Sequence, residues 1–297
     1  MNQTIIVQPS EWKDYQLIDA GDQQKLEKFG EFYLVRPYLD AKWKKTVSND
    51  VWNKADATFI KTKGDSGYWK TAKKLPESWK IHWQNVTTNV HLAPFKHTGV
   101  FPEQCAHWEW MQTILEKNKE EKPEYQPHVL NLFAYTGMAS VVCAKTGAKV
   151  THVDSSRSSI GWAKQNQLAS GLDSNSIRWI LDDVLKVVAR EVKRGVKYDA
   201  IIMDPPAYGH GNTGEVWNFK KSFPKLIDLC REILVEEPLF ILINAYAVSI
   251  SPTQLEYMTK DLVGKTKGTF ESGELRIQAA QSPRYVSTGI FSRFGAK

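Results

Sequence analysis

The sequence has few cysteines and no long apolar run. Its cysteines, Cys105, Cys143 and Cys230, stand far apart and lack the spacing of metal ligands, so no metal site is predicted. Scarce, unclustered cysteine is typical of a reducing compartment, and we expect a cytoplasmic protein. The longest apolar stretch, residues 239–248, is interrupted by Asn244 and is too short to span a bilayer. The start of the chain also lacks the basic flank and apolar core of a secretory signal.

Charged and aromatic residues are unevenly distributed along the chain. Its 297 residues carry a net charge of +6, and residues 41–100 hold eleven lysines against four Asp or Glu. Five of the eleven tryptophans, Trp43, Trp52, Trp69, Trp79 and Trp83, fall in the same stretch. Lysines beside flat rings suit phosphate contact and base stacking in RNA. The alternative is a small β domain with a tryptophan core and a solvated lysine face, and the sequence leaves both interpretations open.

The rhythm of apolar residues divides the chain into three segments. Residues 1–100 are irregular and strand-rich, and we assign them to a β-rich, basic and tryptophan-rich domain that would bind substrate. Residues 101–127 have a helical spacing and then a charged run, which predicts a connecting helix and linker. Residues 128–297 alternate short apolar strands with helices. This alternation predicts an α/β fold with a doubly wound, mostly parallel sheet covered by helices on both faces.

The boundaries of these elements follow from the apolar pattern. The expected strands are residues 128–133, 149–154, 177–181, 198–203 and 239–244, with closing edge strands within 274–294. The expected helices are residues 137–146, 158–170, 184–193, 219–234 and 253–260.

Polar signals follow four successive predicted strands, at the edge where doubly wound sheets bind ligands. After the first strand, residues 131–140 contain a single glycine, Gly137, so the three-glycine dinucleotide fingerprint is absent and nicotinamide and flavin cofactors are disfavoured. After the second comes Asp154, placed where an acid can hold ribose hydroxyls, and after the third come Asp182 and Asp183. Each signal alone also fits a local role: the acids could cap helices and the glycine could serve close packing.

The signal after the fourth strand is the most distinctive. It reads Asp204-Pro205-Pro206-Ala207, followed by Tyr208. Neither proline can donate a backbone N–H, so the chain there stays extended with its carbonyls available. Such a segment can offer hydrogen-bond acceptors and a flat ring to a planar substrate that carries an amine. The alternative is a turn that begins at the acid and closes at the following glycine.

Together these motifs resemble class I S-adenosylmethionine-dependent methyltransferases over residues 129–245, and among them the bacterial large-subunit ribosomal RNA methyltransferases. The matching positions are Asn131, Phe133, Tyr135, Thr136, Gly137, Asp154-Ser155-Ser156, Ala163, Asn166, Asp182 to Val184, and Asp204 to Tyr208. Residues 98–104 resemble the Gly-x-Phe-x-x-Gln segment that borders the cofactor in those proteins. The resemblance implies a Rossmann-like, seven-stranded methyltransferase sheet and S-adenosylmethionine as cofactor.

The resemblance also implies the residues of the site. Asp154 would hold the ribose, Asp183 with Asp182 the adenine end, and residues 131–137 the amino acid portion. The cofactor-binding residues would be Phe101, Gln104, Asn131, Phe133, Ala134, Tyr135, Thr136, Gly137, Asp154, Ser155, Asn166, Asp182 and Asp183. The residues that position the acceptor would be Asp204, Pro205 and Tyr208.

One residue of the resembled family is missing. Members that methylate C5 of cytosine need a thiolate, because C5 is not nucleophilic until sulfur adds at C6. Their cysteine follows the fifth strand, where this chain reads Asn244-Ala245-Tyr246. We therefore expect attack by a lone pair already present on an amine, a ring nitrogen or an oxygen. Asp-Pro-Pro-Tyr is the usual amine-methylating motif, and here Ala207 moves the aromatic by one place.

The sequence thus predicts a methyltransferase that acts on structured RNA, ribosomal RNA first, at a base nitrogen. A second hypothesis keeps the cofactor but takes a small molecule or a protein side chain as acceptor. A third is an RNA-binding module that retains a vestigial cofactor fold. No membrane partner is expected, and the oligomeric state stays open.

Overall fold

The computed structural model describes residues 5–7, 12–62, 66–211 and 214–296. Among them the chain forms two compact units. Unit 1 contains the described residues of 5–7, 106–275 and 288–296, and unit 2 those of 12–105 and 276–287. The expectation that the chain starts without a secretory signal concerns residues of which most, 1–4 and 8–9, lie outside the described residues. Each unit is thus built from segments that are far apart in the sequence. Residues 276–287, near the C-terminus, belong to unit 2, whereas the segments on either side of them belong to unit 1.

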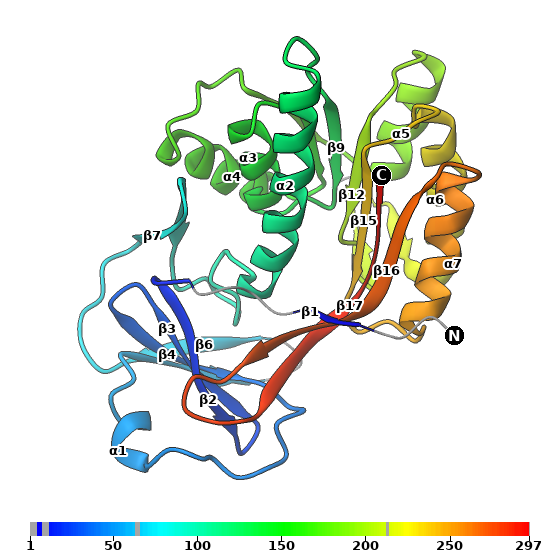
Figure 1. Ribbon diagram of the computed structural model, residues 1–297. Coiled ribbons are helices and arrows are strands. Elements are labelled where there is room, and N and C mark those ends of the chain that lie inside the picture. Colours follow the sequence, from blue (N-terminus) through cyan, green and yellow to red (C-terminus); the bar gives the residue numbers. More distant parts are fainter. Residues whose placement is uncertain (1–4, 8–11, 63–65, 212–213, 297) are drawn as a thin grey trace. The chain divides into compact units, whose positions relative to one another are not determined.

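Unit 1 is built on one mixed sheet of eight strands, in the order β1-β16-β17-β15-β12-β9-β10-β11 (Figure 1). These are β1 (Ile5–Val7), β9 (His128–Leu132), β10 (Lys149–Asp154), β11 (Ile177–Leu181), β12 (Ala200–Met203), β15 (Phe240–Ala245), β16 (Gly268–Gln278) and β17 (Tyr285–Ala296). The five strands from β15 to β11 pair in parallel, while β17 runs antiparallel to β15. The α/β class and the mostly parallel sheet are confirmed. The C-terminal strands were expected at an edge, but β17 lies inside the sheet and β1 is outermost.

Helices cover both faces of this sheet, with α5, α6 and α7 on one side and α2, α3 and α4 on the other (Figure 1). Their bounds are α2 (Cys105–Glu121), α3 (Met138–Lys145), α4 (Arg157–Ala169), α5 (Val184–Lys193), α6 (Phe219–Ile233) and α7 (Pro252–Val263). Because side chains alternate along a strand, Leu130 and Leu132 join the core under α5 and α6, whereas Asn131 faces α3. His152, which pairs with Asn131 in the neighbouring strand β10, also lies on the α3 side, where both side chains meet Ser140.

Side-chain caps mark the beginning of four helices of unit 1. Ser156, Asp183, Asn218 and Ser251 each accept a hydrogen bond from a backbone N–H in the first turn of α4, α5, α6 and α7. Such a cap contributes about 1 kcal/mol and satisfies an otherwise unpaired donor. The first two caps directly follow β10 and β11, so the turns that carry the motif residues have defined ends.

Unit 2 is β-rich and has its own core. Its five-stranded sheet has the order β2-β3-β4-β5-β6, beside a two-stranded pair β7-β8. The elements are β2 (Tyr15–Gly21), β3 (Gln24–Phe29), β4 (Phe32–Pro37), α1 (Asn49–Trp52), β5 (Ala57–Lys61), β6 (Gly67–Thr71), β7 (Trp79–Trp83), β8 (Val86–Val90) and the short 3-10 helix η1 (Pro102–Gln104). A core cluster forms around Ile18, Leu26, Val35 and Trp52.

The tryptophans of the basic stretch are buried or half-buried in unit 2. Trp52 and Trp83 are buried, and the other three are half-buried. The indole N–H of Trp43 donates to the Ala20 carbonyl, that of Trp69 to Ala93, and that of Trp79 to Phe29. The structure therefore supports the interpretation of these rings as core and scaffold, whereas most of the lysines of the stretch are exposed.

Candidate functional site

The strand register gathers the predicted motifs at one edge of the unit 1 sheet. Leu132 at the end of β9 pairs with Val153 of β10 and with Met203 of β12, and Asp154 pairs with Leu181 at the end of β11. The residues that follow these strands must therefore lie side by side. They are Phe133, Asp182 and Asp204, with Asp154 closing its own strand. This carboxyl edge is where parallel sheets bind ligands.

The 133–137 loop after β9 has an unusual backbone. The angle φ is positive at Phe133 (55°), Tyr135 (50°) and Gly137 (79°), so three of five residues adopt the left-handed region. For residues other than glycine such a conformation costs roughly 1–3 kcal/mol and persists only where the surroundings enforce it. A side chain at Gly137 would lie 2.9 Å from Cβ of Ala163 in α4. Glycine is therefore needed both for the backbone angle and for the close approach of the helix.

Asp154 connects the 133–137 loop with the turn that follows β10. One carboxylate oxygen accepts from the backbone N–H of Tyr135 at 2.8 Å, and the other accepts from that of Ser156 at 2.7 Å. Burial raises the pKa of Asp154, although both hydrogen bonds act in the opposite direction. Capping of α4 belongs to Ser156, whose hydroxyl accepts from Ser159, so the capping interpretation of Asp154 is wrong.

Buried polar groups hold the same loop from beneath. Asn166 of α4 is fully buried and donates to the Thr136 carbonyl at 2.9 Å. Asn131 of β9 donates to the Ser140 hydroxyl at 2.9 Å, which lies 3.0 Å from Nδ1 of His152. Burial lowers the pKa of His152 to about 3, so its ring is neutral. Asn131 and Asn166 thus support the loop, and His152 and Ser140 join them without a motif that predicted it.

The acids after β11 have partners within unit 1. Asp183 caps α5 by accepting from the backbone N–H of Lys186 at 3.0 Å, which confirms the capping interpretation. Asp182 accepts from the backbone of Asp183 and from the guanidinium of Arg190 at 2.7 Å. Ser155 lies half-buried in the turn before α4. Contacts of these three residues with a cofactor stay predictions.

The 204–207 loop after β12 leads into a short hairpin that the sequence did not predict. Strands β13 (Tyr208–His210) and β14 (Val216–Asn218) pair antiparallel, and the backbone N–H of Phe219 donates to the Ala207 carbonyl at 3.1 Å. Asp204 is half-exposed, Pro205 is buried, and Tyr208 is 55% exposed. The expected turn that closes at the glycine is thus a strand entrance, with Tyr208 as its first residue.

Trp217 of β14 connects the 204–207 loop with the 133–137 loop. Its indole N–H donates to the Pro206 carbonyl at 2.7 Å, and its ring meets that of Phe133 edge-on at 4.7 Å between centroids. The side chain is buried. Sequence reasoning missed this residue because an isolated tryptophan after a glycine-rich stretch has no local signal for either contact.

Two predicted cofactor residues lie in the other unit. Phe101 precedes η1 and packs against His97, with ring centroids 5.1 Å apart, and Gln104 ends η1. Both are half-buried within unit 2. Their contact with the cofactor stays a prediction.

The cysteines lie in the interior, away from the carboxyl ends of the strands of unit 1 or outside that unit. All three are buried and reduced. Burial raises the pKa of Cys143 to about 12 and raises that of Cys230 further. Because the thiolate is the reactive form, neither of these two can supply the sulfur that C5 methylation requires.

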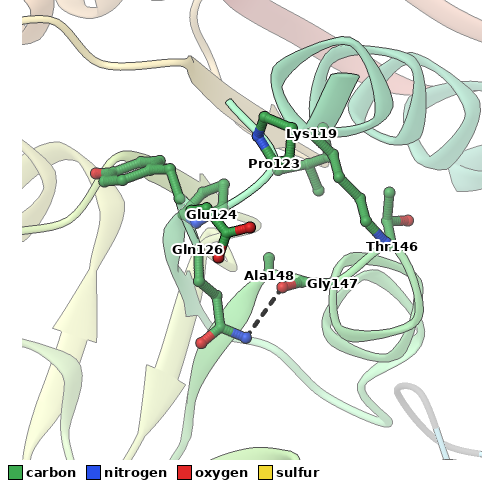
Figure 2. Close-up of a pocket in the computed structure, with 10 residues that line it drawn as sticks. Lys119, Pro123, Glu124, Gln126, Thr146, Gly147 and Ala148 are labelled. Carbon is green, nitrogen blue, oxygen red and sulfur yellow. Dashed lines mark hydrogen bonds between the residues drawn. The ribbon is translucent and has the colours of Figure 1, made fainter. Parts of the chain in front are cut away.

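A cavity of about 190 Å³ opens at the opposite edge of the same sheet (Figure 2). It lies beside the residues that precede β9 and the turn between α3 and β10, and its lining includes Lys119, Glu124, Gln126 and Gly147. Gln126 donates to the Gly147 carbonyl at 3.1 Å across one side of it. None of the predicted site residues lines this cavity, so it is separate from the carboxyl edge.

Comparison with known proteins identifies the family to which the chain belongs. A family model described as S-adenosylmethionine-dependent methyltransferase matches residues 59–259, which is more than half of the chain. The chain belongs to this methyltransferase family. The crystal structure of the SAM-dependent methyltransferase from Agrobacterium tumefaciens is 39% identical, covers 100% of this chain and 98% of its own, and superposes with a TM-score of 0.93.

The curated proteins that match this chain are distant relatives, and the matches cover only part of their length. Ribosomal RNA large subunit methyltransferase I of Aeromonas salmonicida is 36% identical over 104 residues, which are 35% of this chain and 24% of that protein. Ribosomal RNA large subunit methyltransferase K of Neisseria meningitidis is 30% identical over 242 residues, 75% of this chain and 63% of that protein. The match thus spans about a quarter of the first relative's length. This methyltransferase is distantly related to ribosomal RNA methyltransferases.

The residues at the carboxyl edge fit S-adenosylmethionine by their charge. Acidic side chains close the edge at Asp154, Asp182, Asp183 and Asp204. A cofactor with hydroxyl, ammonium and sulfonium groups suits acidic acceptors, whereas the pyrophosphate of a dinucleotide would be repelled. Because Gly137 has no side chain, α4 can approach the 133–137 loop closely beneath the place expected for the cofactor.

Among the helices that the structure describes, each is too short or too polar to cross a membrane.

Proposed function

We propose that this methyltransferase acts on a base nitrogen in structured RNA, with ribosomal RNA as the first candidate. The supporting observation is the contact between the 204–207 and 133–137 loops. The backbone N–H of Asp204 points to the Leu132 carbonyl at 3.4 Å, and Trp217 bridges Pro206 and Phe133. A group held by the first loop would therefore lie beside a cofactor held by the second.

The role of each residue follows from its chemistry. When bound, the cofactor supplies an electrophilic methyl group on a sulfonium. Asp204 and the Pro205 carbonyl would accept hydrogens of the target amine and so aim its lone pair. The Pro206 carbonyl already accepts from Trp217, so it fixes the loop. Holding reacting groups in line can contribute about 7–11 kcal/mol to the lowering of the barrier.

Tyr208 would stack on the target base. Its ring is 55% exposed at the start of β13, directly after the loop. A base that leaves its stack loses a few kcal/mol, and contact with an aromatic ring offsets that loss. The alternative, attack by a cysteine on C6, is disfavoured because Asn244-Ala245-Tyr246 stands where the cysteine is expected, and burial raises the pKa values of Cys143 and Cys230.

Three further assignments belong to this proposal. Asp154 would hold the ribose, Asp182 and Asp183 the adenine end, and Phe101 and Gln104 would border the cofactor. Unit 2, with its exposed lysines, would contribute to RNA binding. The three buried, reduced cysteines are consistent with a cytoplasmic setting.

Nucleoside mass spectrometry on ribosomal RNA from a deletion strain tests the proposal. We expect one N-methylated nucleoside to disappear, and to return with the wild-type gene but not with Asp204→Asn. Purified enzyme and labelled cofactor should methylate RNA from the deletion strain only. Loss of a C5-methylated base would contradict the nitrogen target. Label that enters a small molecule or a protein instead would establish the alternative acceptor class.

A further inference from the structure

The hairpin after the acceptor loop has two unlike faces. The register pairs Tyr208 with Asn218 and His210 with Val216, so these side chains lie on one face, and Gly209 with Trp217 lie on the other. Along β13 and β14, the exposed residues Tyr208, His210 and Val216 alternate with the less exposed Gly209 and Trp217. The hairpin is thus a small platform with a fixed inner side and an open outer side.

The inner side holds the hairpin in place. Trp217 is buried against Phe133 and donates to the Pro206 carbonyl. Glu215, which precedes β14, forms an ion pair with Lys186 of α5. These contacts hold β14 and the residue before it against the rest of unit 1. The outer face of the hairpin therefore has a defined orientation beside the 204–207 loop.

The outer face exposes apolar and aromatic surface. Tyr208 is 55% exposed and Val216 is 57% exposed. His210 is also exposed, and its ring meets that of Tyr208 edge-on at 5.1 Å between centroids. Large apolar side chains gathered on one exposed face commonly mark a binding surface.

Positive charge follows this hairpin directly in the sequence. Lys220, Lys221 and Lys225 are exposed on the α6 segment that follows β14, and residues 216–227 contain no Asp or Glu. The first two lie in the first turn of α6, where the helix dipole disfavours a positive charge. Lysines in such a position break a local rule, which is frequent where function requires the charge. Charge and aromatic surface together match a polyanion with flat bases.

We propose that the outer face of the hairpin binds a single-stranded stretch of RNA beside the target nucleotide, and we name it the hairpin platform (Tyr208, His210, Val216, Lys220 and Lys221). This inference rests on the proposed function and specifies how its substrate is held. His210 and Val216 contact a base next to the target, and the lysines contact its phosphates. A duplex hides the faces of its bases, so the platform selects unpaired RNA.

Fluorescence anisotropy with a labelled single-stranded RNA of mixed sequence tests the platform. His210→Ser combined with Val216→Ser should weaken binding roughly 5-fold or more, because one stacked base is worth ~1–3 kcal/mol. Lys220→Gln combined with Lys221→Gln should reduce the slope of log affinity against log salt by about 1.4, since each phosphate contact on a single strand contributes ~0.7. A duplex of the same sequence should bind the wild type more weakly.

Control variants remove an exposed ring and two exposed lysines elsewhere on unit 1. Tyr257→Ser removes an equally exposed ring from α7, and Lys265→Gln with Lys267→Gln removes two exposed lysines after that helix. These controls should bind RNA like the wild type. All variants should bind S-adenosylhomocysteine with unchanged affinity in isothermal titration, which shows that the carboxyl edge is intact.

Each other outcome overturns the platform. It is wrong if the wild type binds no single-stranded RNA, if the platform variants match the controls, or if duplex RNA binds as tightly. Platform variants that change the sedimenting mass but not RNA affinity would identify a protein interface instead. A deletion strain that keeps every methylated nucleoside contradicts the proposed function, whereas unchanged RNA affinity of the variants contradicts the platform alone.

Discussion

Gly137→Ala is the most informative perturbation of the 133–137 loop, because the structure separates its two effects. The backbone effect arises from φ of +79°, which disfavours any side chain by about 1–2 kcal/mol. The packing effect arises from the new Cβ, which would lie 2.9 Å from Cβ of Ala163 and 3.3 Å from the His152 ring. Overpacking of this kind costs about 1–3 kcal/mol. We expect a total loss of about 2–5 kcal/mol in unfolding free energy.

Gly171→Ala is the matched control. Gly171 has φ of +72°, and a Cβ there would meet nothing within 4 Å, so only the backbone effect applies. Its loss should be about 1–2 kcal/mol. Urea unfolding monitored by circular dichroism gives both values. Isothermal titration should also show weaker S-adenosylhomocysteine binding for Gly137→Ala than for Gly171→Ala, because only the first displaces the loop.

A double-mutant cycle with Ala163→Gly isolates the packing effect. That substitution alone should destabilise α4 by about 1 kcal/mol, the ordinary cost of glycine in a helix. Combined with Gly137→Ala, it removes the shorter contact and should recover about 1–3 kcal/mol relative to additivity. A cycle that is additive within 0.5 kcal/mol, or equal losses for the two glycine variants, would refute the reasoning.

Three further predictions test other parts of the molecule. Trp217→Phe keeps the ring against Phe133 but removes the hydrogen bond to the Pro206 carbonyl; it should cost about 1 kcal/mol and reduce methyl transfer while S-adenosylhomocysteine affinity stays unchanged, and a parallel fall of both would contradict the bridging role. The three buried cysteines should resist iodoacetamide at pH 8 until denaturant is added, and replacing all three by alanine should leave the methylated product the same; early labelling or a lost product would restore thiolate chemistry. Burial lowers the pKa of His107 and of His152 to about 3. Below pH 6.5 the unfolded chain therefore binds more protons than the folded protein. The free energy of unfolding should decrease as the pH falls, by about 2 kcal/mol for each ring at pH 5. Urea midpoints at pH 7 and pH 5 measure this loss, and a midpoint that does not fall would contradict it.

Local signals explain why part of the fold was predictable. Strand β11 and helix α5 occupy the predicted ranges 177–181 and 184–193, because a short apolar run and an amphipathic run, separated by a capping acid, are encoded by adjacent residues. The carboxyl edge was predictable for the same reason, since parallel strands place the residues after them together. The hairpin of β13 and β14 was not, because its pairing depends on residues across a turn and on Trp217 contacts made elsewhere in unit 1.

The sequence by itself determined the α/β class, the methyltransferase motifs and their order along one edge, because apolar periodicity and the residues after each strand are local properties. Only the tertiary structure decided what individual side chains do. It assigned Asp183 to a helix cap, Trp52 to the unit 2 core, and Asn166 to the support of the 133–137 loop. It also placed β17 inside the sheet and joined residues 276–287 to unit 2. These outcomes depend on partners far away in the chain, which no pattern of neighbouring residues specifies.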